Sequence, residues 1–295
     1  MIYFHADDYG ISKSQTDMIC ECFDGKLNSV SLMPNSAYLS EAARRLPKEC
    51  RKVVHLNFIE GPCMASPKQI PLLATSEGML NCSFMKALKY SLAFPKKRRE
   101  AFHQFRLEIE AQIMAVVRAL RQTNDSDGIK LSIDSHQHLH MVPIVFRALM
   151  TVLKKLMDND IIQQVDCIRV SVDPFKVLLS KPNWILRVPV KNYIKWCILK
   201  ILSLGKKKKI AKIGGRVPVF FGIFFTCQME EKVVNAFLAS YEKIAREKKS
   251  DLELMFHPGA VYALEELLDS GQSDLVRFYK SDNRKKEKEY LLVCK

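Results

Sequence analysis

The sequence predicts an α/β fold in which parallel strands alternate with helices, either as an open doubly wound sheet or as a barrel. Two observations support this prediction: short apolar segments of strand length recur along the chain, and the segments between them carry apolar residues at helical spacing. Neither G-x-G-x-x-G nor G-x-x-x-x-G-K-[ST] follows a predicted strand, so dinucleotide-binding and P-loop folds lack support. The 295 residues suffice for a large buried core.

The first predicted strand shows the pattern clearly, because Ile2, Phe4 and Ala6 alternate with the residues between them. The predicted strands cover residues 1–6, 28–33, 53–58, 130–135, 167–171, 218–225 and 252–256. The predicted helices cover residues 13–24, 38–46, 98–121, 142–157, 190–204 and 230–249. Their alternation along the chain is what favours parallel strands joined by helical crossovers.

The net charge of +14 is concentrated in one segment. Residues 174–229 contain no Asp or Glu and carry twelve Lys and Arg residues, and removing these twelve leaves +2 for the remainder. We expect Arg187, Lys191 and Lys195 to share one helical stripe there. We therefore expect residues 174–216 to form a basic helical insertion, or lid, with membrane-surface or polyanion binding as the alternatives. The apolar residues expected to face inward are Ile194, Ile198, Ile201 and Leu202.

The remaining composition predicts a cytoplasmic protein. The nine cysteines are odd in number and contain no C-x-x-C, so we expect them to be reduced. Because the sequence begins at its first predicted strand we expect no signal peptide, and no apolar run has the length of a membrane span. Neither a nucleic-acid partner nor stable membrane insertion is expected, and homo-oligomerisation is left open.

Two adjacent carboxylates, Asp7 and Asp8, end the first predicted strand and precede Tyr9 and Gly10. Burying adjacent carboxylates costs free energy unless a metal ion or another cation compensates them. The structural alternative is that one of them caps the helix that begins near Lys13.

Histidines gather at the ends of other predicted strands. His55, His136 and His257 belong to three separate strand ends, and in a parallel fold those ends share one edge. A carboxylate with two imidazoles suits a divalent metal that also binds water and substrate. If the fourth strand continues, His136, His138 and His140 share one face of it.

A serine-hydrolase site is not supported. The adjacent residues Asp134, Ser135 and His136 point alternately to opposite faces of a strand, so they cannot form a triad with one another. The sequence also lacks a G-x-S-x-G elbow and an H-E-x-x-H helix.

These motifs, in this order, resemble the YdjC/ChbG-like carbohydrate deacetylase family, which belongs to the polysaccharide-deacetylase-like barrels. The matching residues span nearly the whole chain and are 6–10, 25, 28–33, 35, 55–57, 60–62, 134–140, 143, 169, 253–255 and 257–259. The resemblance implies a distorted TIM-like (β/α) barrel in a single catalytic domain over residues 1–295. The sequence departs from the family pattern in the basic segment and at His5, a position where the family usually has a small or polar residue.

The resemblance also implies an activity. It implies metal-dependent removal of N-acetyl groups from amino sugars or short, chitooligosaccharide-type sugars. The metal would be held by Asp8, His55 and His136, with Mg²⁺ most often assigned in the family, and with Zn²⁺ or another divalent ion as the alternative.

The residues near such a metal suggest roles for the reaction. Asp7 could accept a proton from the attacking water, and His257 could protonate the departing amine. Because adjacent side chains diverge, only one of Asp7 and Asp8 is expected to bind the metal, and the two could exchange roles. The candidates for orienting the ligands or binding substrate are His138, His140 and Arg169.

Two other functions stay open on this sequence. One is another metal-dependent hydrolase on the same barrel, acting on a phosphoester or a cyclic amide. The other is a polyanion- or membrane-surface-binding protein that uses the basic segment.

Overall fold

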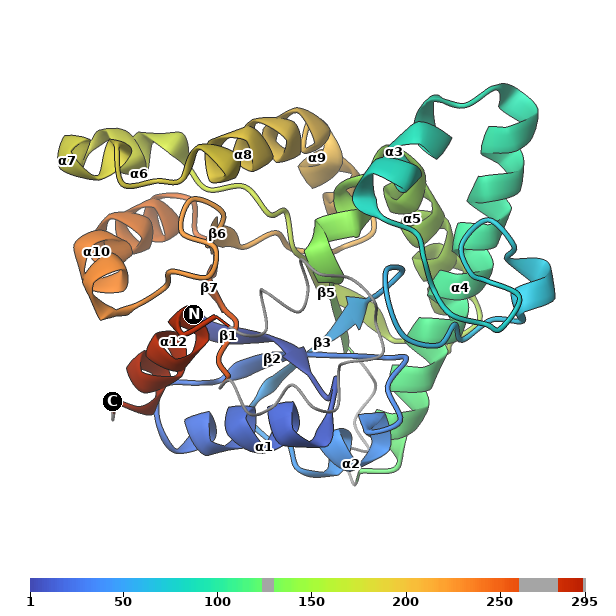
Figure 1. Ribbon diagram of the computed structural model, residues 1–295, viewed down its shortest axis with the longest axis horizontal. Helices are drawn as coiled ribbons and strands as arrows, with labels where there is room; N and C mark the ends of the chain where they lie inside the picture. The colour runs from blue at the N-terminus through green and yellow to red at the C-terminus, as the bar shows by residue number, and fades with distance from the viewer. Residues whose placement is uncertain (124–129, 260–280, 294–295) are drawn as a thin grey trace.

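The computed structural model describes residues 1–123, 130–259 and 281–293, in which seven strands are surrounded by helices (Figure 1). The strands are β1 (Ile2–Tyr9), β2 (Ser29–Leu32), β3 (Arg51–Leu56), β4 (Lys130–Ser135), β5 (Gln164–Ile168), β6 (Val219–Phe221) and β7 (Leu252–Phe256). The helices are α1 (Lys13–Glu21), α2 (Leu39–Arg44), α3 (Phe84–Leu92), α4 (Pro95–Arg121), α5 (Pro143–Asp158), α6 (Phe175–Leu179), α7 (Pro182–Ile185), α8 (Val190–Leu202), α9 (Lys206–Ala211), α10 (Glu231–Glu247) and α12 (Asn283–Leu292). Short 3-10 helices are η1 (Cys22–Asp24), η2 (Pro67–Gln69) and η3 (His136–Met141).

All neighbouring strands are parallel, in the order β5-β4-β3-β2-β1-β7-β6. The two edges of the sheet meet just before β6: the Arg216 N–H donates to the Asp166 carbonyl at 2.8 Å, and the Ile168 N–H donates to the Arg216 carbonyl at 3.0 Å. The sheet therefore curves into a distorted barrel whose seam is a bridge between Cys167 and Arg216. The predicted parallel α/β fold is confirmed, and the carboxyl ends of its strands share one rim.

The two faces of the curved sheet differ in polarity. One face packs apolar residues such as Ala6, Val30 and Ile133 beneath the helices, and these side chains are fully or almost fully buried. Residues at alternate positions point to the other face, inside the barrel. Several of these are polar and buried: His5, Asp7, Ser29, Ser31, His55, Asp134 and Glu253. A hydrogen-bonded polar network therefore occupies the interior, where such barrels usually have packed apolar layers.

Several elements differ from the sequence prediction. The helices α3 and α12 were not predicted, and β5 begins and ends three residues earlier than expected. The predicted strand 218–225 shortens to β6, because the buried Asp173 carboxylate accepts the backbone N–H groups of Gly222, Ile223 and Phe224. Those amides are thus bound by a side chain instead of a neighbouring strand.

The basic segment 174–216 forms helices α6 to α9, which connect β5 to β6 (Figure 1, yellow). On α8, the buried positions are Asn192 and Leu199. Ile194, Ile198 and Ile201 are exposed, so the prediction that they face inward is wrong. Leu202 is half-buried. This segment therefore exposes apolar as well as basic side chains.

The predicted basic stripe on α8 is shorter than expected. Arg187 precedes the helix and its guanidinium lies 4.9 Å from the ring of Trp184. Lys191 and Lys195 remain one turn apart on α8. None of the helices in the described part of the chain has the length and apolar character needed to cross a membrane.

Candidate metal centre

A bulge at the end of β1 separates the two adjacent carboxylates. The register between β1 and β2 shifts between Ala6 and Tyr9, and Asp8 has a left-handed φ of 64°. Such backbone costs free energy for a residue other than glycine and is concentrated at functional sites. Asp7 and Asp8 are both buried and have different partners. Ser12 caps α1, so the cap alternative for this pair is wrong.

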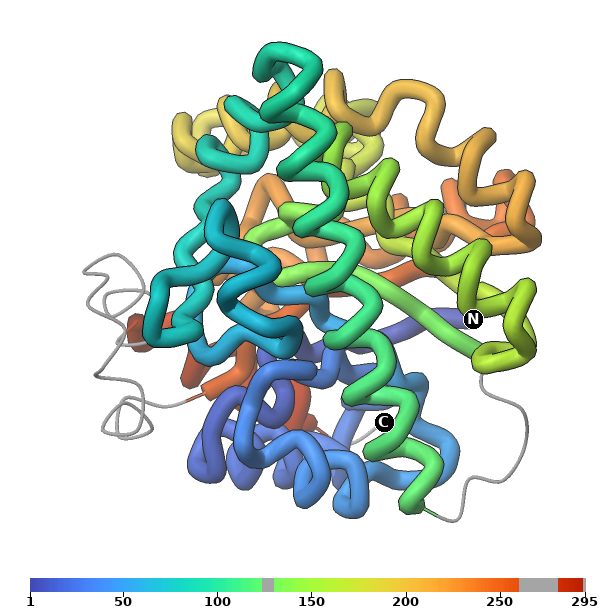
Figure 2. The backbone as a smooth tube through the Cα atoms, turned by 90° about the vertical axis from the view of Figure 1, so that its right-hand side faces the viewer, coloured from blue at the N-terminus to red at the C-terminus, as the bar shows by residue number. Residues whose placement is uncertain are grey.

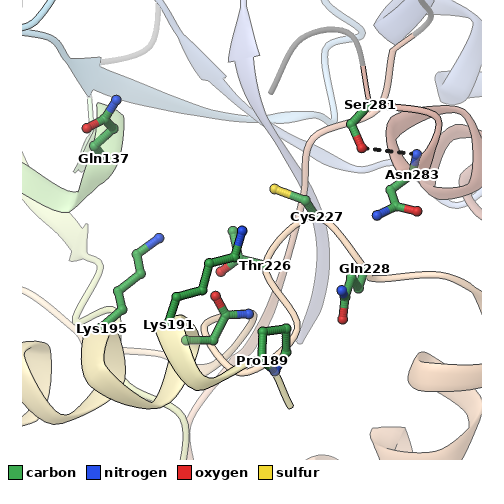
Figure 3. Close-up of a pocket in the computed structure, with 10 residues that line it drawn as sticks. Gln137, Pro189, Lys191, Lys195, Thr226, Cys227, Gln228, Ser281 and Asn283 are labelled. Carbon is green, nitrogen blue, oxygen red and sulfur yellow. Dashed lines mark hydrogen bonds between the residues drawn. The ribbon is translucent and has the colours of Figure 1, made fainter. Parts of the chain in front are cut away.

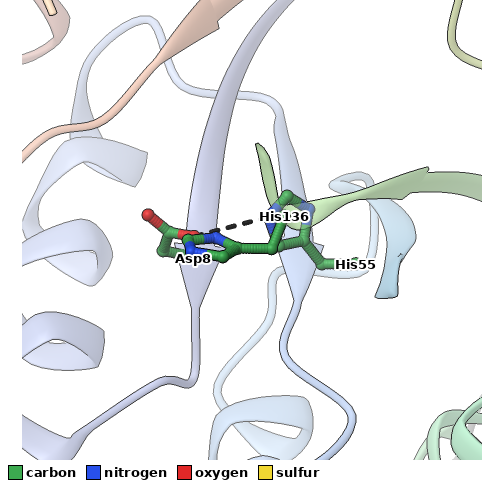
Figure 4. Close-up of side chains that lie close together, drawn as sticks. All are labelled: Asp8, His55 and His136. Carbon is green, nitrogen blue, oxygen red and sulfur yellow. Dashed lines mark hydrogen bonds and ion pairs between the residues drawn. The ribbon is translucent and has the colours of Figure 1, made fainter. Parts of the chain in front are cut away.

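Asp8 meets His55 and His136 at the ends of β1, β3 and β4 (Figure 4). Asp8 Oδ1 lies 2.9 Å from His136 Nδ1 and 3.3 Å from His55 Nε2, and one ligand atom from each residue lies within 4.8 Å of the others. All three side chains are buried. Asp8 Oδ2, His55 Nε2 and His136 Nε2 make no well-aligned hydrogen bond among the described residues, and carboxylate oxygens of Asp8 and Glu60 lie 3.3 and 3.1 Å from the two imidazole nitrogens. Because buried polar atoms are normally satisfied, three such atoms in one cluster indicate a cation site.

The charges of this cluster fit a divalent cation. Burial by itself lowers the pKa of each histidine, but the Asp134 carboxylate raises the pKa of His55 to about 9, and the Asp8 carboxylate raises that of His136 to about 10. Without a cation, both imidazoles therefore carry protons that compensate the buried carboxylates. A divalent cation supplies the same charge and leaves the imidazoles neutral, the form in which they bind metals.

Asp134 positions His55 from the inside of the barrel. Its Oδ1 lies 2.6 Å from His55 Nδ1, and its Oδ2 accepts a hydrogen bond from the Ser31 hydroxyl at 2.5 Å. The Nε2 atom of His55 is left facing Asp8. A carboxylate behind a metal-binding imidazole fixes the tautomer and orientation of the ring.

Arg169 binds the carboxylates of the interior. Its Nη1 and Nη2 donate to the two oxygens of Asp7 at 3.0 and 2.9 Å, and its Nε donates to Glu253 at 2.5 Å. Burial alone would raise the pKa of Asp7, but Arg169 holds it well below its usual range. His5, Asp7 and Asp134 also lie close enough to hold a metal. Their two carboxylates already bind the Arg169 guanidinium, so of the two clusters among the described residues only that of Asp8 is open to a cation.

The chain after β4 turns sharply instead of continuing as a strand. Gln137 and His138 have left-handed φ values of 49° and 59°, which end the alternation of side chains. The strand does not continue past Ser135, so His136, His138 and His140 do not share one strand face. The ring of His138 lies against Phe220 of β6, and burial lowers the pKa of His138 well below its usual value.

His140 supports the turn from within. Its Nε2 donates to the Arg169 carbonyl at 2.8 Å, so its Nδ1 accepts from the Ser135 hydroxyl at 2.7 Å. Burial lowers the pKa of His140 to about 4, which keeps the ring neutral at neutral pH. Both ring nitrogens are thus used in fixing the end of β4 beside Arg169.

His257 lies on the Asp7 side of the centre, just after β7. Its Nε2 is 3.8 Å from Asp7 Oδ2. Burial lowers the pKa of His257 to about 4, so the free protein holds it neutral. The backbone N–H of His257 donates to Glu287 of α12 at 2.6 Å, which ties this residue to the C-terminal helix.

Comparison with known proteins gives the family and the fold of the chain. The family model described as "YdjC-like protein" matches residues 1–294. The chain belongs to the YdjC-like family. No curated protein matches the chain. A solved structure from Enterococcus faecalis V583, of a protein proposed to cleave cellobiose phosphate, has a TM-score of 0.55 and 18% identity and covers 99% of this chain and 95% of its own. At that identity the likeness shows the fold.

The YdjC-like chain has a cavity of about 740 Å³ beside the centre (Figure 3). It is lined by Gln137, which follows His136, and by the two lysines of α8, Lys191 and Lys195. The described lining contains no Asp or Glu. The charge of Lys195 also acts on His138 and Asp7. The cavity is therefore positively charged next to the candidate metal centre. Its other lining residues are Pro189, Asn192, Thr226, Cys227, Gln228, Ser281 and Asn283.

Sequence reasoning missed several residues of this site. Asp134 was considered only within a triad, and His5, Glu60 and Glu253 received no role. Glu60 Oε1 lies 3.1 Å from His136 Nε2. One signal in the sequence could have indicated the polar interior. Polar residues two positions apart, such as His5 and Asp7, point to the same face of a strand.

Proposed function

We propose that this YdjC-like chain is a metal-dependent hydrolase that removes N-acetyl groups from amino sugars or short oligosaccharides. The observation that carries the proposal is the buried cluster of Asp8, His55 and His136, whose unsatisfied donor atoms meet at the carboxyl rim of the barrel. Relationship of the YdjC-like family to carbohydrate deacetylases supports the choice of reaction.

We assign Asp8, His55 and His136 as the ligands. A bound divalent cation supplies Lewis acidity, which polarises an acetamide carbonyl and lowers the pKa of water. Mg²⁺ is the ion suggested by the family resemblance, whereas two imidazole ligands favour Zn²⁺. Reconstitution of the metal-free protein with each ion, followed by an activity assay, distinguishes them.

We assign proton transfer to Asp7 and His257. Asp7 is ionised, so its carboxylate can accept the proton lost by water, and its ion pair with Arg169 makes it a weak base that passes this proton on to His257. His257 is neutral in the free protein, and its Nε2 lies 3.8 Å from Asp7 Oδ2. Once it receives a proton, it can protonate the departing amine, and the nearby Asp7 carboxylate stabilises the imidazolium.

We assign the residues behind this pair to positioning. Arg169 orients Asp7, Asp134 orients His55, and His140 fixes the turn that carries His136. His138 lines the interior with a neutral ring whose Nδ1 has no hydrogen-bond partner among the described residues, so it is available to a sugar hydroxyl.

The charge of the adjacent cavity supports an anionic sugar, such as a phosphorylated or uronic sugar, as the preferred substrate. The Enterococcus faecalis neighbour is itself named for a sugar phosphate. Replacing Lys191 and Lys195 with Met is expected to lower kcat/KM for anionic sugars and to leave kcat/KM for neutral sugars nearly unchanged. Equal losses on both substrates would contradict this specificity.

Acetate release tests the activity itself. The panel contains N-acetylglucosamine oligomers and their phosphorylated forms, each assayed with and without chelator. We expect acetate release that stops with chelator and returns with added metal. If no member releases acetate, a phosphoesterase or cyclic-amide hydrolase replaces the deacetylase. A phosphoesterase built on two metals is less favoured, because Arg169 occupies the second cluster.

We also propose a cytoplasmic location. The eight cysteines among the described residues are all free, which suits a reducing compartment.

A further inference from the structure

We propose that one end of the molecule docks onto the surface of an anionic phospholipid bilayer. The docking face consists of α8 with the residues just before it and of the turn between α3 and α4. Its exposed apolar residues are Leu92, Phe94, Leu186, Val190, Ile194, Ile198 and Ile201. This inference is independent of the proposed reaction.

The first part of the docking face is an apolar stripe along α8. Val190, Ile194, Ile198 and Ile201 recur every three or four residues and so fall within an arc of about 100° on the helix. The opposite side of the helix packs Asn192 and Leu199 into the protein. The side chains of Val190, Ile194 and Ile201 are 74%, 56% and 67% exposed. The helix therefore has a second apolar side that the described residues leave uncovered.

The second part is the turn between α3 and α4. Leu92 and Phe94 are 80% and 88% exposed there. Figures 1 and 2 place this turn and α8 at the same end of the molecule, at the top of both views. Phe84 at the start of α3 also lines one cavity together with Ile194 and Ile198 of α8. The apolar stripe of α8 and the turn between α3 and α4 therefore lie at the same end of the molecule and can contact one surface together.

The charge of the chain is concentrated at this end. The acid-free segment 174–229 carries twelve Lys and Arg residues, and residues 84–99, which form α3 and its turn into α4, contain six more and no Asp or Glu. Subtracting these eighteen from the net charge of +14 leaves −4 for the rest of the chain. Exposed cations accompany both parts of the docking face. Lys96 and Lys97 follow the turn between α3 and α4, Lys200 is on α8, and Lys207 is on α9.

An anionic bilayer is the partner that uses both properties. Apolar side chains on an interfacial helix enter the boundary between headgroups and acyl chains, while nearby Lys and Arg bind anionic headgroups. A second copy of the chain would bring eighteen like charges against eighteen. Nucleic acid would use the cations but would not need the apolar stripe. The face is thus complementary to lipid in both respects.

Docking would bring the candidate site to the lipid surface. A cavity of about 330 Å³ is lined both by Ile194 and Ile198 of the stripe and by Gln137, which follows His136. The same cavity includes Lys191 and Lys195, which line the larger cavity beside the metal centre. The route between the docking face and the site is therefore short.

Vesicle sedimentation with the full-length chain tests the proposal. We expect partitioning onto phosphatidylcholine vesicles containing about a third phosphatidylserine to exceed that onto pure phosphatidylcholine by at least about tenfold at low salt, and to fall steeply at high salt.

Two double variants distinguish binding through the docking face from non-specific adsorption to vesicles. The variant Ile194→Glu/Ile201→Glu is expected to lose at least about tenfold of its partitioning onto the anionic vesicles. The control Met79→Glu/Val293→Glu removes two exposed apolar residues elsewhere and adds the same charge, and it is expected to bind like the wild type. Thermal unfolding of each variant confirms that the fold is intact.

Three results would overturn the proposal. The first is wild-type protein that stays in solution with anionic vesicles at low salt. The second is a folded Ile194→Glu/Ile201→Glu variant that binds vesicles like the wild type. Binding would then depend on charge alone, as expected for a nucleic-acid-binding surface. The third is a dimer in sedimentation velocity that the same variant dissociates, without vesicle binding, which would make the face a contact between copies.

Discussion

At the scale of single residues, the central feature is that Asp7 and Asp8 belong to different charge centres. Asp7 pairs with the Arg169 guanidinium, whereas Asp8 pairs with two histidines. A side chain that is neutralised by a buried guanidinium is poorly placed to bind a metal as well. The local bulge in β1 thus gives two neighbouring carboxylates different chemistry.

Asp134→Asn is expected to lower metal affinity about 10–100-fold, because the carboxylate that orients His55 is lost. Titration calorimetry with the metal-free protein measures this loss. Asp166→Asn is the matched control, since Asp166 lies on the adjacent strand β5 and pairs with the exposed Arg216. An unchanged metal affinity in Asp134→Asn would remove this residue from the centre.

His257→Ala is expected to reduce kcat by about 10²–10⁴-fold while metal affinity changes little, because His257 is assigned to proton transfer. Steady-state kinetics and metal titration of the same preparation give the two quantities. A parallel loss of metal binding would instead make His257 a ligand.

The neutral state of His140 predicts a pH dependence of stability. Burial lowers its pKa to about 4, whereas the unfolded chain binds this proton near pH 6.5. The unfolded state therefore holds more protons between these values, so stability present above pH 6.5 is lost as the pH falls towards 4. Chemical unfolding between pH 4 and 7 should show a destabilisation on the order of 3 kcal/mol that His140→Asn no longer has. Equal slopes for the two proteins would contradict a neutral buried His140.

At the scale of secondary-structure elements, the site depends on how β1 and β4 end. At the end of each strand the backbone enters the left-handed region, at Asp8 and Gly10 in β1 and the residue after it, and at Gln137 and His138 after β4. These turns direct side chains to the rim that regular strands would place on opposite faces. The elements could be predicted from apolar spacing, but these turns could not, because Asp8, Gln137 and His138 are not glycines.

Gly10→Ala tests the turn after β1. Gly10 has a φ of 87°, and a Cβ there would lie 3.2 Å from the Cβ of Ala42. We expect a loss of about 1–2 kcal/mol in the free energy of unfolding together with weaker metal binding. Gly205→Ala is the control, because its φ is 73° and a Cβ would contact nothing within 4 Å. A control that weakens metal binding equally would show that turn strain at Gly10 is not the cause.

At the scale of the whole molecule, the barrel brings together residues distant in the sequence. The order of strands and helices, the rim position of Asp7, Asp8, His55, His136 and His257, and the family follow from pattern and motif. The hydrogen bonds of the polar interior could not be predicted in this way, because they join side chains that are far apart in the sequence, such as Ser31 and Asp134. The outward stripe of α8 was also missed, since an apolar helical face usually predicts burial.

The most direct test of the central claim is anomalous diffraction from crystals of the chain grown or soaked with Mn²⁺. We predict one strong peak within about 2.0–2.3 Å of a ligand atom of Asp8, His55 and His136, which disappears in Asp8→Ala. A peak at the His5–Asp7–Asp134 cluster, two peaks sharing the rim, or no peak under metal-replete conditions would contradict the assignment of a single metal centre to Asp8, His55 and His136.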